Sequence, residues 1–450
     1  MKTALVILAA GKGTRMNSDL PKVMHPLAGA PLFVHAMQAG ASLAPDHTVV
    51  VAGHGADMVR RAALAHDETA QVVEQTEQLG TAHAAAQARA ALAGFDGTAI
   101  VLFGDTPFVR PATLEQMVAA QVDSDVVILG FEAADPGRYG RLVMQGEHLE
   151  RIVEFKDATS SERAIPLCNS GVIACHAATL FDLIDAVEND NAAGEYYLTD
   201  IVALARAKGL NASVVRCEES ETLGINTRAE LAGAEAAFQR RARALAFEDG
   251  VTMPAPETVH FAFDTVIGRD TVVEPNVVFG PGVTVESGVT VRAFSHLEGC
   301  HVARGAVVGP YARLRPGTEL SENTRVGNFV EIKNARIGEN SKVNHLSYIG
   351  DATLGRSTNV GAGTITCNYD GVMKHHTVIG DNAFIGSNTM LVAPVQIGDG
   401  AMTGSGSVIT SDVDADALAL ARAPQIEKPG RAAKLLQILK AKKAKLQRSS

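Results

Sequence analysis

The hydrophobic pattern divides the chain into two halves with different periods. In residues 1–226, short apolar runs such as ALVILAA, TVVVAGH and TAIVLFGD alternate with helical patterns such as ADMVRRAALAH and ATLEQMVAAQ. This alternation predicts an α/β domain with a largely parallel sheet and helices on both faces. Ligands of such folds bind at the carboxyl ends of the strands, and the segments GKGTR and GDTP fall there.

A connecting helix is predicted over residues 227–249. Thr227 and Glu230 have the spacing of a capping box. Apolar residues then recur on one helical face, at Leu231, Ala234, Phe238, Ala242 and Leu245.

The hydrophobic period changes to six in residues 250–428. Aliphatic or aromatic residues recur at this spacing, with register shifts, at Ile267, Val273, Phe279, Val285, Val291, Leu297, Val326, Ile332, Ile337, Val343, Ile349, Ile379, Ile385, Leu391 and Ile397. Glycine often follows them, so the pattern predicts a parallel β-helix of stacked short strands. The segment CNYDGVMKHH (residues 367–376) cannot fit a six-residue coil, and we expect it to protrude as a loop. Residues 429–450 contain a basic helical pattern that is expected to be a solvated end.

Composition narrows the class of protein. A chain of 450 residues has material for two or three domains, and its net charge of −10 argues against a general nucleic-acid binder. No apolar run reaches membrane-spanning length, so no membrane insertion is expected. Five dispersed cysteines without a CxxC pair indicate reduced thiols in a cytoplasmic protein, and no zinc site is expected.

The first sixteen residues, MKTALVILAAGKGTRM, allow two interpretations. The basic start and apolar run resemble an export signal, but Lys12 and Arg15 occupy the place of the cleavage region. We therefore expect a strand that enters a phosphate-binding loop, with backbone N–H groups and two cations, Arg15 and Lys22, facing the phosphates. Asp105, just after an apolar strand, offers a hard oxygen ligand for Mg²⁺.

The motifs of the first half resemble those of the sugar-nucleotide pyrophosphorylases. They are LAAGKGTRM (8–16), EQLGTAHA (77–84), FGDTP (103–107), RYGRLV (138–143), IVEFKDA (152–158), CNSGV (168–172), EYYLTD (195–200) and GINTR (224–228). The resemblance implies a Rossmann-like nucleotidyltransferase domain in which a sugar 1-phosphate oxygen attacks the α-phosphorus of UTP and pyrophosphate leaves. The nucleophile is already ionised, so no protein base is required; positioning and charge neutralisation by residues such as Arg15 and Lys22 carry the catalysis.

The same resemblance implies the binding residues of this domain. Mg²⁺ would be held by Asp105 and Asn226. The nucleotide would be bound by Leu8, Ala9, Ala10, Gly11, Lys22, Phe103, Gly104 and Asp105, with uracil at Gln75, Gly80 and Thr81. The sugar would be held by Gly140, Glu154 and Asn169. Phe103 stands where relatives often have tyrosine, so a contact from that hydroxyl is absent here.

The second half carries polar motifs that a scaffold would not need. They are RLRPG (313–317), FVEIKNAR (329–336), KVNHLSYIG (342–350), NVGAGTITCNYDG (359–371) and IGSNT (385–389). With the first half, they resemble the family of bifunctional enzymes that join an N-acetylglucosamine-1-phosphate uridylyltransferase to a glucosamine-1-phosphate acetyltransferase. This resemblance covers nearly the whole chain. It implies a left-handed parallel β-helix, a homotrimer, acetyl-CoA as co-substrate and a product that feeds cell-envelope synthesis.

Acetyl transfer needs a base for the amine, and a neutral imidazole suits that task. The resemblance assigns the base to His345, and the sugar phosphate to Arg315, Lys333 and Tyr348. It places Asn359 at the sugar, Asn368 and Tyr369 beside the sugar and acetyl-CoA, and the remaining acetyl-CoA contacts at Ala362, Ser387, Ser405 and Arg422. The chain has no tryptophan. PGRAAK (429–434) stands where relatives often carry one.

Two alternatives remain open from the sequence. The chain could be a pyrophosphorylase whose β-helix only assembles a trimer; His345, Lys333 and the CNYDG segment argue against this. It could also be a non-catalytic subunit that retained both folds, against which Arg15, Lys22, Asp105 and Asn226 argue. Consumption of acetyl-CoA and magnesium-dependent release of pyrophosphate separate these alternatives.

Overall fold

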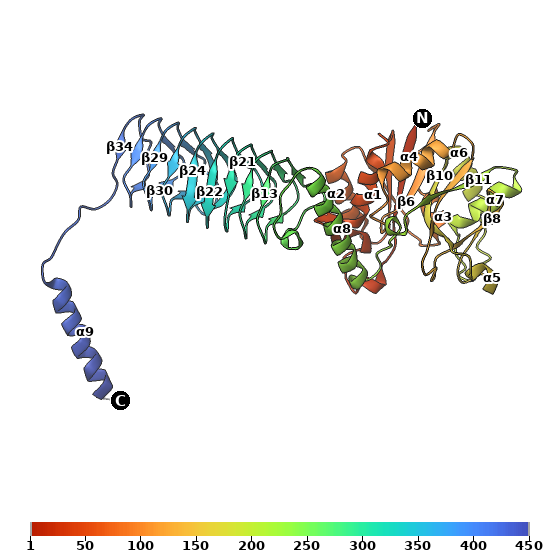
Figure 1. The fold of residues 1–450 in the computed structure, drawn as a ribbon, viewed down its shortest axis with the longest axis horizontal. Coiled ribbons are helices and arrows are strands. Elements are labelled where there is room, and N and C mark those ends of the chain that lie inside the picture. The colour runs from red at the N-terminus through yellow and green to blue at the C-terminus, as the bar shows by residue number, and fades with distance from the viewer. Residues whose placement is uncertain (1, 449–450) are drawn as a thin grey trace. The chain divides into compact units, whose positions relative to one another are not determined.

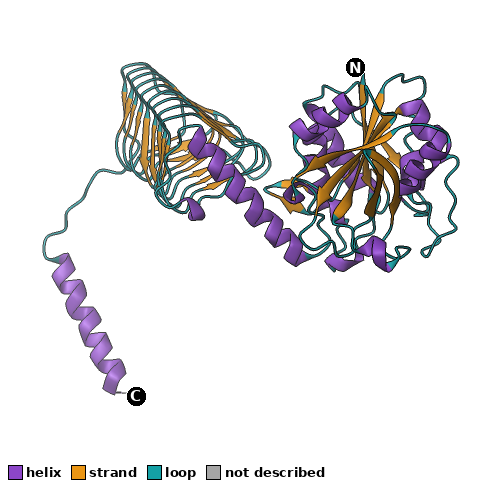
Figure 2. Ribbon diagram, turned by 45° about the vertical axis from the view of Figure 1, so that its right-hand side comes forward, coloured by secondary structure: helices purple, strands orange, loops and turns teal. Residues whose placement is uncertain are grey.

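The computed structural model describes residues 2–448, which divide into two compact units (Figures 1 and 2). Unit 1 holds the residues up to Leu245 together with Phe261–Thr265. Unit 2 holds Ala246–His260 and the residues from Val266 onward. The finer limits predicted above, at residues 226, 249 and 428, stay predictions.

Unit 1 is built on a twisted sheet with the order β11-β7-β10-β6-β1-β4-β5. The strands are β1 (Thr3–Ala9), β4 (His47–Ala52), β5 (Gln71–Glu74), β6 (Thr98–Phe103), β7 (Val126–Glu132), β10 (Leu167–His176) and β11 (Ala212–Cys217). The pairings are parallel except that β10 runs antiparallel to both β6 and β7. Two further strands, β8 (Arg141–Gln145) and β9 (His148–Val153), pair antiparallel with each other, and β8 also pairs with β10. The predicted, largely parallel sheet is confirmed.

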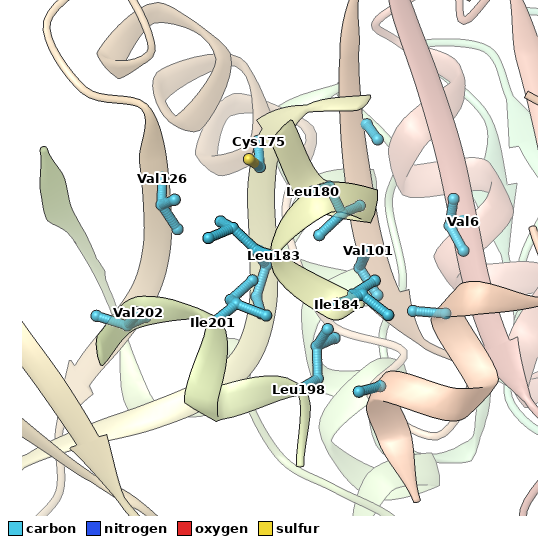
Figure 3. Close-up of a cluster of buried hydrophobic side chains, with 14 of the residues drawn as sticks. Val6, Val101, Val126, Cys175, Leu180, Leu183, Ile184, Leu198, Ile201 and Val202 are labelled. Carbon is cyan, nitrogen blue, oxygen red and sulfur yellow. The ribbon is translucent and has the colours of Figure 1, made fainter. Parts of the chain in front are cut away.

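Helices cover both faces of this sheet, as the alternation along β1 requires. Leu5, Ile7 and Ala9 pack with α1, α2 and α4, whereas Val6 and Leu8 pack with α3, α6 and α7. Figure 3 shows part of the second cluster, with Val6 and Val101 from the strands near Leu180 and Ile184. The helices are α1 (Leu32–Ala41), α2 (Ala56–His66), α3 (Thr81–Ala86), α4 (Pro111–Ala120), α5 (Ser160–Arg163), α6 (Ala177–Ile184) and α7 (Ile201–Ala207). Short 3₁₀ turns and a small strand pair complete the unit: Thr14–Met16, Lys22–Met24, Leu198–Asp200, Glu219–Glu221, β2 (Pro26–Leu27) and β3 (Ala30–Pro31).

Residues 2–16, KTALVILAAGKGTRM, form the predicted strand and loop. Every residue of β1 is buried, and the strand pairs in parallel with β4 on one side and β6 on the other. The loop with Gly11 and Gly13 follows at the carboxyl end of this strand. The strand interpretation is therefore confirmed.

Helix α8 (Arg228–Glu248) begins with the predicted capping box. The Glu230 backbone N–H donates to Thr227 Oγ1, and Glu230 Oε2 accepts from the Thr227 N–H. The first half of the helix packs on the core of unit 1 through Leu231, Ala234 and Phe238. Leu245, on the same face, is half exposed.

Unit 2 is a parallel β-helix whose short strands stack coil upon coil (Figure 1). One ladder runs through β13 (Val272–Val273), β16 (Thr290–Val291), β19 (Val307–Val308), β22 (Arg325–Asn328), β24 (Lys342–His345), β26 (Asn359–Val360), β29 (Phe384–Ile385), β32 (Met402–Thr403) and β34 (Leu418–Ala419). The other faces contain β12 (Val266–Ile267), β14 (Val278–Phe279), β15 (Thr284–Val285), β17 (His296–Leu297), β18 (Cys300–Val302), β20 (Arg313–Leu314), β21 (Thr318–Leu320), β23 (Glu331–Ile337), β25 (Tyr348–Leu354), β27 (Ile365–Cys367), β28 (Thr377–Ile379), β30 (Met390–Val392), β31 (Val395–Ile397) and β33 (Val408–Ile409). A short 3₁₀ turn, Pro256–Thr258, precedes the first coil.

The six-residue pattern marks the interior of this β-helix. The predicted inward residues from Val273 to Ile397 are buried, and only Ile267, in the first coil, is partly exposed. The segment 367–376 leaves the coil as predicted, and Val372 at its tip is 88% exposed. The register across this segment confirms an insertion, since Ala352 pairs with Thr377.

The C-terminal segment forms helix α9 (Arg431–Arg448). Its side chains are exposed as far as residue 447, including those of Leu435, Leu439 and Leu446. The prediction of a solvated helical end is confirmed. Among the described residues, no helix is both long and apolar enough to cross a membrane.

Candidate active sites

A cavity of about 290 Å³ opens at the carboxyl ends of β1 and β6 in unit 1. Predicted nucleotide-binding residues from motifs far apart in the sequence line it: Leu8, Ala10, Gly11, Lys22, Gln75, Gly80, Thr81, Phe103 and Asp105. Ala9, between two of them, is turned into the core. Gly104 directly follows β6, and its backbone N–H donates to the carbonyl of Leu8 on β1. The cavity is also lined by Gln78 and Glu195, two residues that the sequence reasoning had not singled out.

The glycine loop passes directly over Lys22. Gly13 has a φ of +60°, and a Cβ at this position would lie 2.3 Å from the Lys22 Cβ. Only glycine tolerates both this conformation and this approach. The loop therefore packs on Lys22, whose Nζ pairs with Asp105, just beyond the end of β6.

Four polar side chains meet beside the cavity. Lys22 Nζ forms an ion pair with Asp105 and donates to Asn226 Oδ1 at 3.1 Å. Arg15 Nη2 donates to the same Asn226 oxygen at 2.8 Å. The two oxygens that the resemblance assigns to a metal thus face one point, next to two cations.

Arg228 holds the loop of residues 13–16 in place. This arginine belongs to the GINTR motif, but sequence reasoning assigned it no role. Its Nε donates to the Met16 carbonyl at 3.3 Å, and its Nη1 lies 3.2 Å from Nδ1 of the buried His25. Burial and the Arg228 charge lower the pKa of His25. A neutral His25 accepts at Nδ1, which fixes Arg228 and, through it, the loop that carries Arg15.

The expected uracil end of the cavity is preorganised. Gln75 is buried, and its Nε2 donates to the Gly80 carbonyl at 3.2 Å and contacts His83 Nδ1 at 3.0 Å. Thr81 Oγ1 accepts from the Leu198 N–H at 2.9 Å. Gly80 has a φ of +122°, and a Cβ there would meet the backbone of Tyr196. Gly80 and Thr81 are thus held against the EYYLTD segment, and Gln75 is joined to them through the Gly80 carbonyl.

The three predicted sugar-binding residues form a second group. A Cβ on Gly140 would lie 3.5 Å from Glu154 Oε1 and 3.6 Å from the Asn169 Cβ. Glu154 lines a hollow of about 320 Å³ together with Arg138, Phe155, Lys156 and Tyr197. Burial raises the pKa of Glu154, and the nearby Asp200 and Asp157 charges add to this, whereas a hydrogen bond from Thr199 opposes it. A carboxyl group in such a place suits the recognition of sugar hydroxyl or amide groups.

The Glu154→Gln variant is expected to unfold at a higher temperature at neutral pH than the original chain. The raised pKa means that ionised Glu154 costs stability once the pH exceeds the unfolded-state value, about 4.3. Thermal unfolding followed across the pH range checks this: the difference should grow as the pH rises above the unfolded-state value and vanish below it. A variant that is equally or less stable at neutral pH would contradict it.

Phe103 contributes to the cavity through the packing of its ring, since it has no hydroxyl group. Gly171, in the CNSGV motif, has a φ of +90°, and a Cβ there would lie 2.6 Å from Phe103 Cε2. The ring therefore lies against the backbone of this motif. This contact positions β6 and β10 around the cavity without the oxygen that a tyrosine would add.

The predicted acetyl-transfer residues of unit 2 form a line across successive coils. The Gly363 N–H donates to the His345 carbonyl, the Asn388 N–H to Ala362 and the Gly406 N–H to Ser387. Arg422 Nη1 donates to the Ser405 carbonyl. His345, Ala362, Ser387, Ser405 and Arg422 are thus brought together along one corner of the β-helix.

The imidazole of His345 has one fixed partner. Its Nδ1 lies 2.8 Å from Oδ1 of Asn328, its parallel neighbour on β22. An amide oxygen only accepts, so Nδ1 carries the proton and Nε2 is the basic nitrogen. The ring is exposed, so this nitrogen is accessible to a substrate.

A cationic cluster lies beside the neighbouring strands β20, β23 and β25: Arg315 follows β20, and Lys333 is on β23. Arg315 pairs with Glu331 at 2.8 Å, and Lys333 lies opposite Gly350. A Cβ on Gly350 would meet the Tyr348 hydroxyl at 2.3 Å, so glycine makes room for this ring. Asn368 Nδ2 lies 3.4 Å from the same hydroxyl.

The structure adds Lys374 to this cluster. A hydrogen bond with Lys333 and the charge of Lys333 lower the pKa of Lys374. Two lysines held side by side attract a dianion such as a sugar phosphate. The position of Lys374 depends on how the 367–376 loop folds back, and no sequence spacing revealed it.

Asn359 is not joined to these groups by contacts among the described residues, whereas Tyr369 pairs through its backbone with Lys374 of the cationic cluster. Asn359 lies on β26 between Lys342 and Phe384. Tyr369 is 60% exposed on the protruding loop, where its hydroxyl donates to the Gly371 carbonyl. The segment PGRAAK leads into α9, and its side chains are exposed.

Two family models match the chain. The MobA-like NTP transferase domain matches residues 5–199, and the bacterial transferase hexapeptide repeat matches residues 264–299 and 376–411. These matches and the parallel coils confirm the predicted fold class, a Rossmann-like nucleotidyltransferase domain followed by a left-handed parallel β-helix.

Curated relatives match over the whole length. The chain is 76% identical to a protein of Roseobacter denitrificans and 70% identical to one of Ruegeria pomeroyi, in each case over 450 residues and 100% of both chains. It is 62% identical to a protein of Paracoccus denitrificans over 98% of both chains. All three relatives are named bifunctional protein GlmU. The chain therefore belongs to the GlmU family of bifunctional proteins.

Proposed function

We propose that the two units of this bifunctional transferase, an enzyme of UDP-N-acetylglucosamine synthesis, act in sequence at two separate sites. The enzyme transfers acetyl from acetyl-CoA to glucosamine 1-phosphate, and then uridylyl from UTP to N-acetylglucosamine 1-phosphate. We assign the first step to the β-helix corner with His345 and the second to the cavity of unit 1. The observation that carries the assignment is the gathering of residues from distant motifs around that cavity.

In the uridylyl step, a phosphate oxygen of the sugar attacks the α-phosphorus of UTP and pyrophosphate leaves. The loop with Gly11 and Gly13 presents backbone N–H groups to the phosphates, and Lys22 and Arg15 neutralise the charge that develops. Gln75, Gly80 and Thr81 hold uracil, and Gly140, Glu154 and Asn169 hold the sugar. Catalysis rests on position and charge, since the attacking phosphate is already a nucleophile.

The oxygen pair of this site fits Mg²⁺. Asp105 and Asn226 both contact Lys22 Nζ, so their oxygens converge on one point, and a carboxylate with an amide oxygen is a hard donor set. We assign these two residues as the protein ligands. Mg²⁺ held by these two residues would supply positive charge that lowers the repulsion between the reacting phosphates.

In the acetyl step, the amine of glucosamine 1-phosphate attacks the thioester carbonyl carbon. His345 Nε2 takes a proton from the attacking amine, a C–N bond forms, the C–S bond breaks, and coenzyme A leaves as the thiol. Asn328 keeps the imidazole in the tautomer that this requires. Arg315, Lys333, Tyr348 and Asn359 bind the sugar phosphate, whereas Ala362, Ser387, Ser405 and Arg422 contact acetyl-CoA. The Ser387 N–H is our candidate donor to the oxyanion.

A homotrimer is supported by an exposed aromatic ridge on one corner of the β-helix. Phe294, Tyr311 and Phe329 stack with centroids 4.9 and 5.2 Å apart, and Leu346, beside His345, continues the column with 60% exposure. A contiguous apolar ridge of this kind marks an interface. A trimer that uses this ridge would bring residues of a neighbouring chain, such as Asn359, to the acetyl site. The five cysteines are free thiols, which supports the predicted cytoplasmic location.

The Tyr311→Asp variant is expected to dissociate into monomers. A carboxylate in the middle of the stacked ridge would be desolvated in an apolar interface. Light scattering should give three times the chain mass for the original protein and one chain mass for the variant. The variant should lose thiol release but keep pyrophosphate release; a monomeric original protein with full acetyltransferase activity would contradict the trimer.

The proposed function is tested by supplying the purified chain with one substrate pair at a time. Glucosamine 1-phosphate with acetyl-CoA should release thiol, and N-acetylglucosamine 1-phosphate with UTP and Mg²⁺ should release pyrophosphate. Pyrophosphate without thiol would mean that the β-helix is a scaffold, and neither product would mean a non-catalytic subunit.

A further inference from the structure

A buried carboxylate lies behind the cationic cluster of unit 2. Asp351, on β25, is only 7% exposed. Its Oδ1 accepts from Asn334 Nδ2 at 2.6 Å, and its Oδ2 accepts from Asn368 Nδ2. Burial alone would raise the pKa of Asp351, but the hydrogen bonds from Asn334 and Asn368 and the charges of Lys333 and Lys374 hold it below its usual value. The side chain is therefore an ionised group that only accepts hydrogen bonds.

This carboxylate dictates which way the Asn368 amide faces. The amide nitrogen points to Asp351 and to the Tyr348 hydroxyl. The reverse orientation would place the amide oxygen against a carboxylate oxygen, which is unfavourable. Asn368 Oδ1 is consequently the end left for another partner, and within residues 2–448 no group donates to it.

The turn itself does not require aspartate at this position. Asp351 has a φ of +48°, a conformation that glycine and asparagine also adopt. Either residue would spare the chain the cost of a buried charge. We therefore explain the presence of a charged side chain at this position by its interactions, a hydrogen bond with the Asn368 amide and attraction to the neighbouring lysines.

We propose that Asp351 is a positioning residue of the acetyl site, which aims Asn368 Oδ1 at an N–H or O–H donor of the amino sugar. This inference rests on the proposed function of the cluster. Lys333 and Lys374 would bind the phosphate of the same substrate, so the amide oxygen and the cations recognise the two polar ends of one molecule. The remaining proposed acetyl-CoA contacts, Ala362, Ser387, Ser405 and Arg422, lie along the other row of residues, so we assign the Asn368 oxygen to the sugar alone.

Steady-state kinetics of three variants test the proposal. Asp351→Gly removes both acceptor oxygens without straining the turn, and Asp351→Asn keeps one acceptor. Asn334→Gly, at a φ of +44°, removes the other hydrogen bond to Asp351 but leaves the Asn368 contact, and serves as the matched control. The KM for acetyl-CoA of the same chains, a substrate that unit 2 itself binds, shows whether the β-helix is folded.

We expect Asp351→Gly to raise the KM for glucosamine 1-phosphate about tenfold or more, the usual effect of one lost hydrogen bond near a charged group. The KM for acetyl-CoA should stay unchanged, Asp351→Asn should restore most of the loss, and Asn334→Gly should behave like the original chain. Three results would overturn the role of Asp351 without touching the proposed function. They are equal changes in both KM values, equal effects of Asp351→Gly and Asn334→Gly, and no effect of Asp351→Gly. An original chain that releases no thiol would overturn the proposed function as well.

Discussion

Replacement of His345 by alanine is expected to slow acetyl transfer by about 10²- to 10⁴-fold, the usual contribution of a positioned general base. The variant lacks the nitrogen that accepts the amine proton, while the residues that bind the sugar phosphate and acetyl-CoA remain. The kcat for thiol release should therefore fall much more than the KM values rise. Because His345 is an exposed residue of unit 2, pyrophosphate release from N-acetylglucosamine 1-phosphate and UTP should be unchanged.

His301 provides the matched control for this substitution. It lies in the same β-helix, on β18, and pairs with Glu286 at 3.1 Å, away from the line of acetyl-site residues. His301→Ala should keep both activities, because an exposed ion pair contributes little to stability. If His345→Ala retained normal thiol release, another group would be the base and the assignment would be wrong.

Replacement of Asp105 by asparagine is expected to reduce uridylyl transfer by about 10²- to 10³-fold, as for the loss of one preorganised electrostatic contact to the transition state. Asparagine keeps the size of the side chain but removes its negative charge. That charge faces Lys22 and is the one we propose to bind the metal ion. The concentration of Mg²⁺ needed for half-maximal pyrophosphate release should rise together with the fall in rate. Thiol release from acetyl-CoA should not change.

The control here is Asp96→Asn, which removes a carboxylate from the same unit. Asp96 is exposed and pairs only with His176 in the contacts described for it. Its replacement should alter neither the rate nor the Mg²⁺ dependence. If Asp105→Asn kept the original Mg²⁺ dependence, Asp105 would not be a ligand of the ion.

The sequence predicted features that depend on periodic burial or on contiguous motifs. The alternation of Leu5 and Val6 between two faces of β1 follows from strand geometry, and the six-residue period located the interior of the β-helix. The carboxyl-end rule placed the GKGTR and GDTP segments at one edge of the sheet, and the structure connects Arg15 and Asp105 through Asn226 and Lys22.

Contacts between distant segments were beyond such reasoning. Arg228 holds the Met16 carbonyl across 212 positions of the chain, and no local pattern encodes that pairing. Lys374 and Asp351 were missed because their neighbours are fixed by how an irregular loop folds against the coils. The role of Asn359 stays a prediction, because the contacts described within one chain do not join this residue to the acetyl site.

The central claim is that one chain carries two independent active sites, and mixing the two inactive variants tests it most directly. Supplied with glucosamine 1-phosphate, acetyl-CoA, UTP and Mg²⁺, neither His345→Ala nor Asp105→Asn should form appreciable UDP-N-acetylglucosamine alone. The mixture should form it after a lag, because one variant releases the acetylated sugar and the other uridylylates it. A mixture that remains as inactive as its components, or a single variant that has lost both thiol and pyrophosphate release, would contradict the claim.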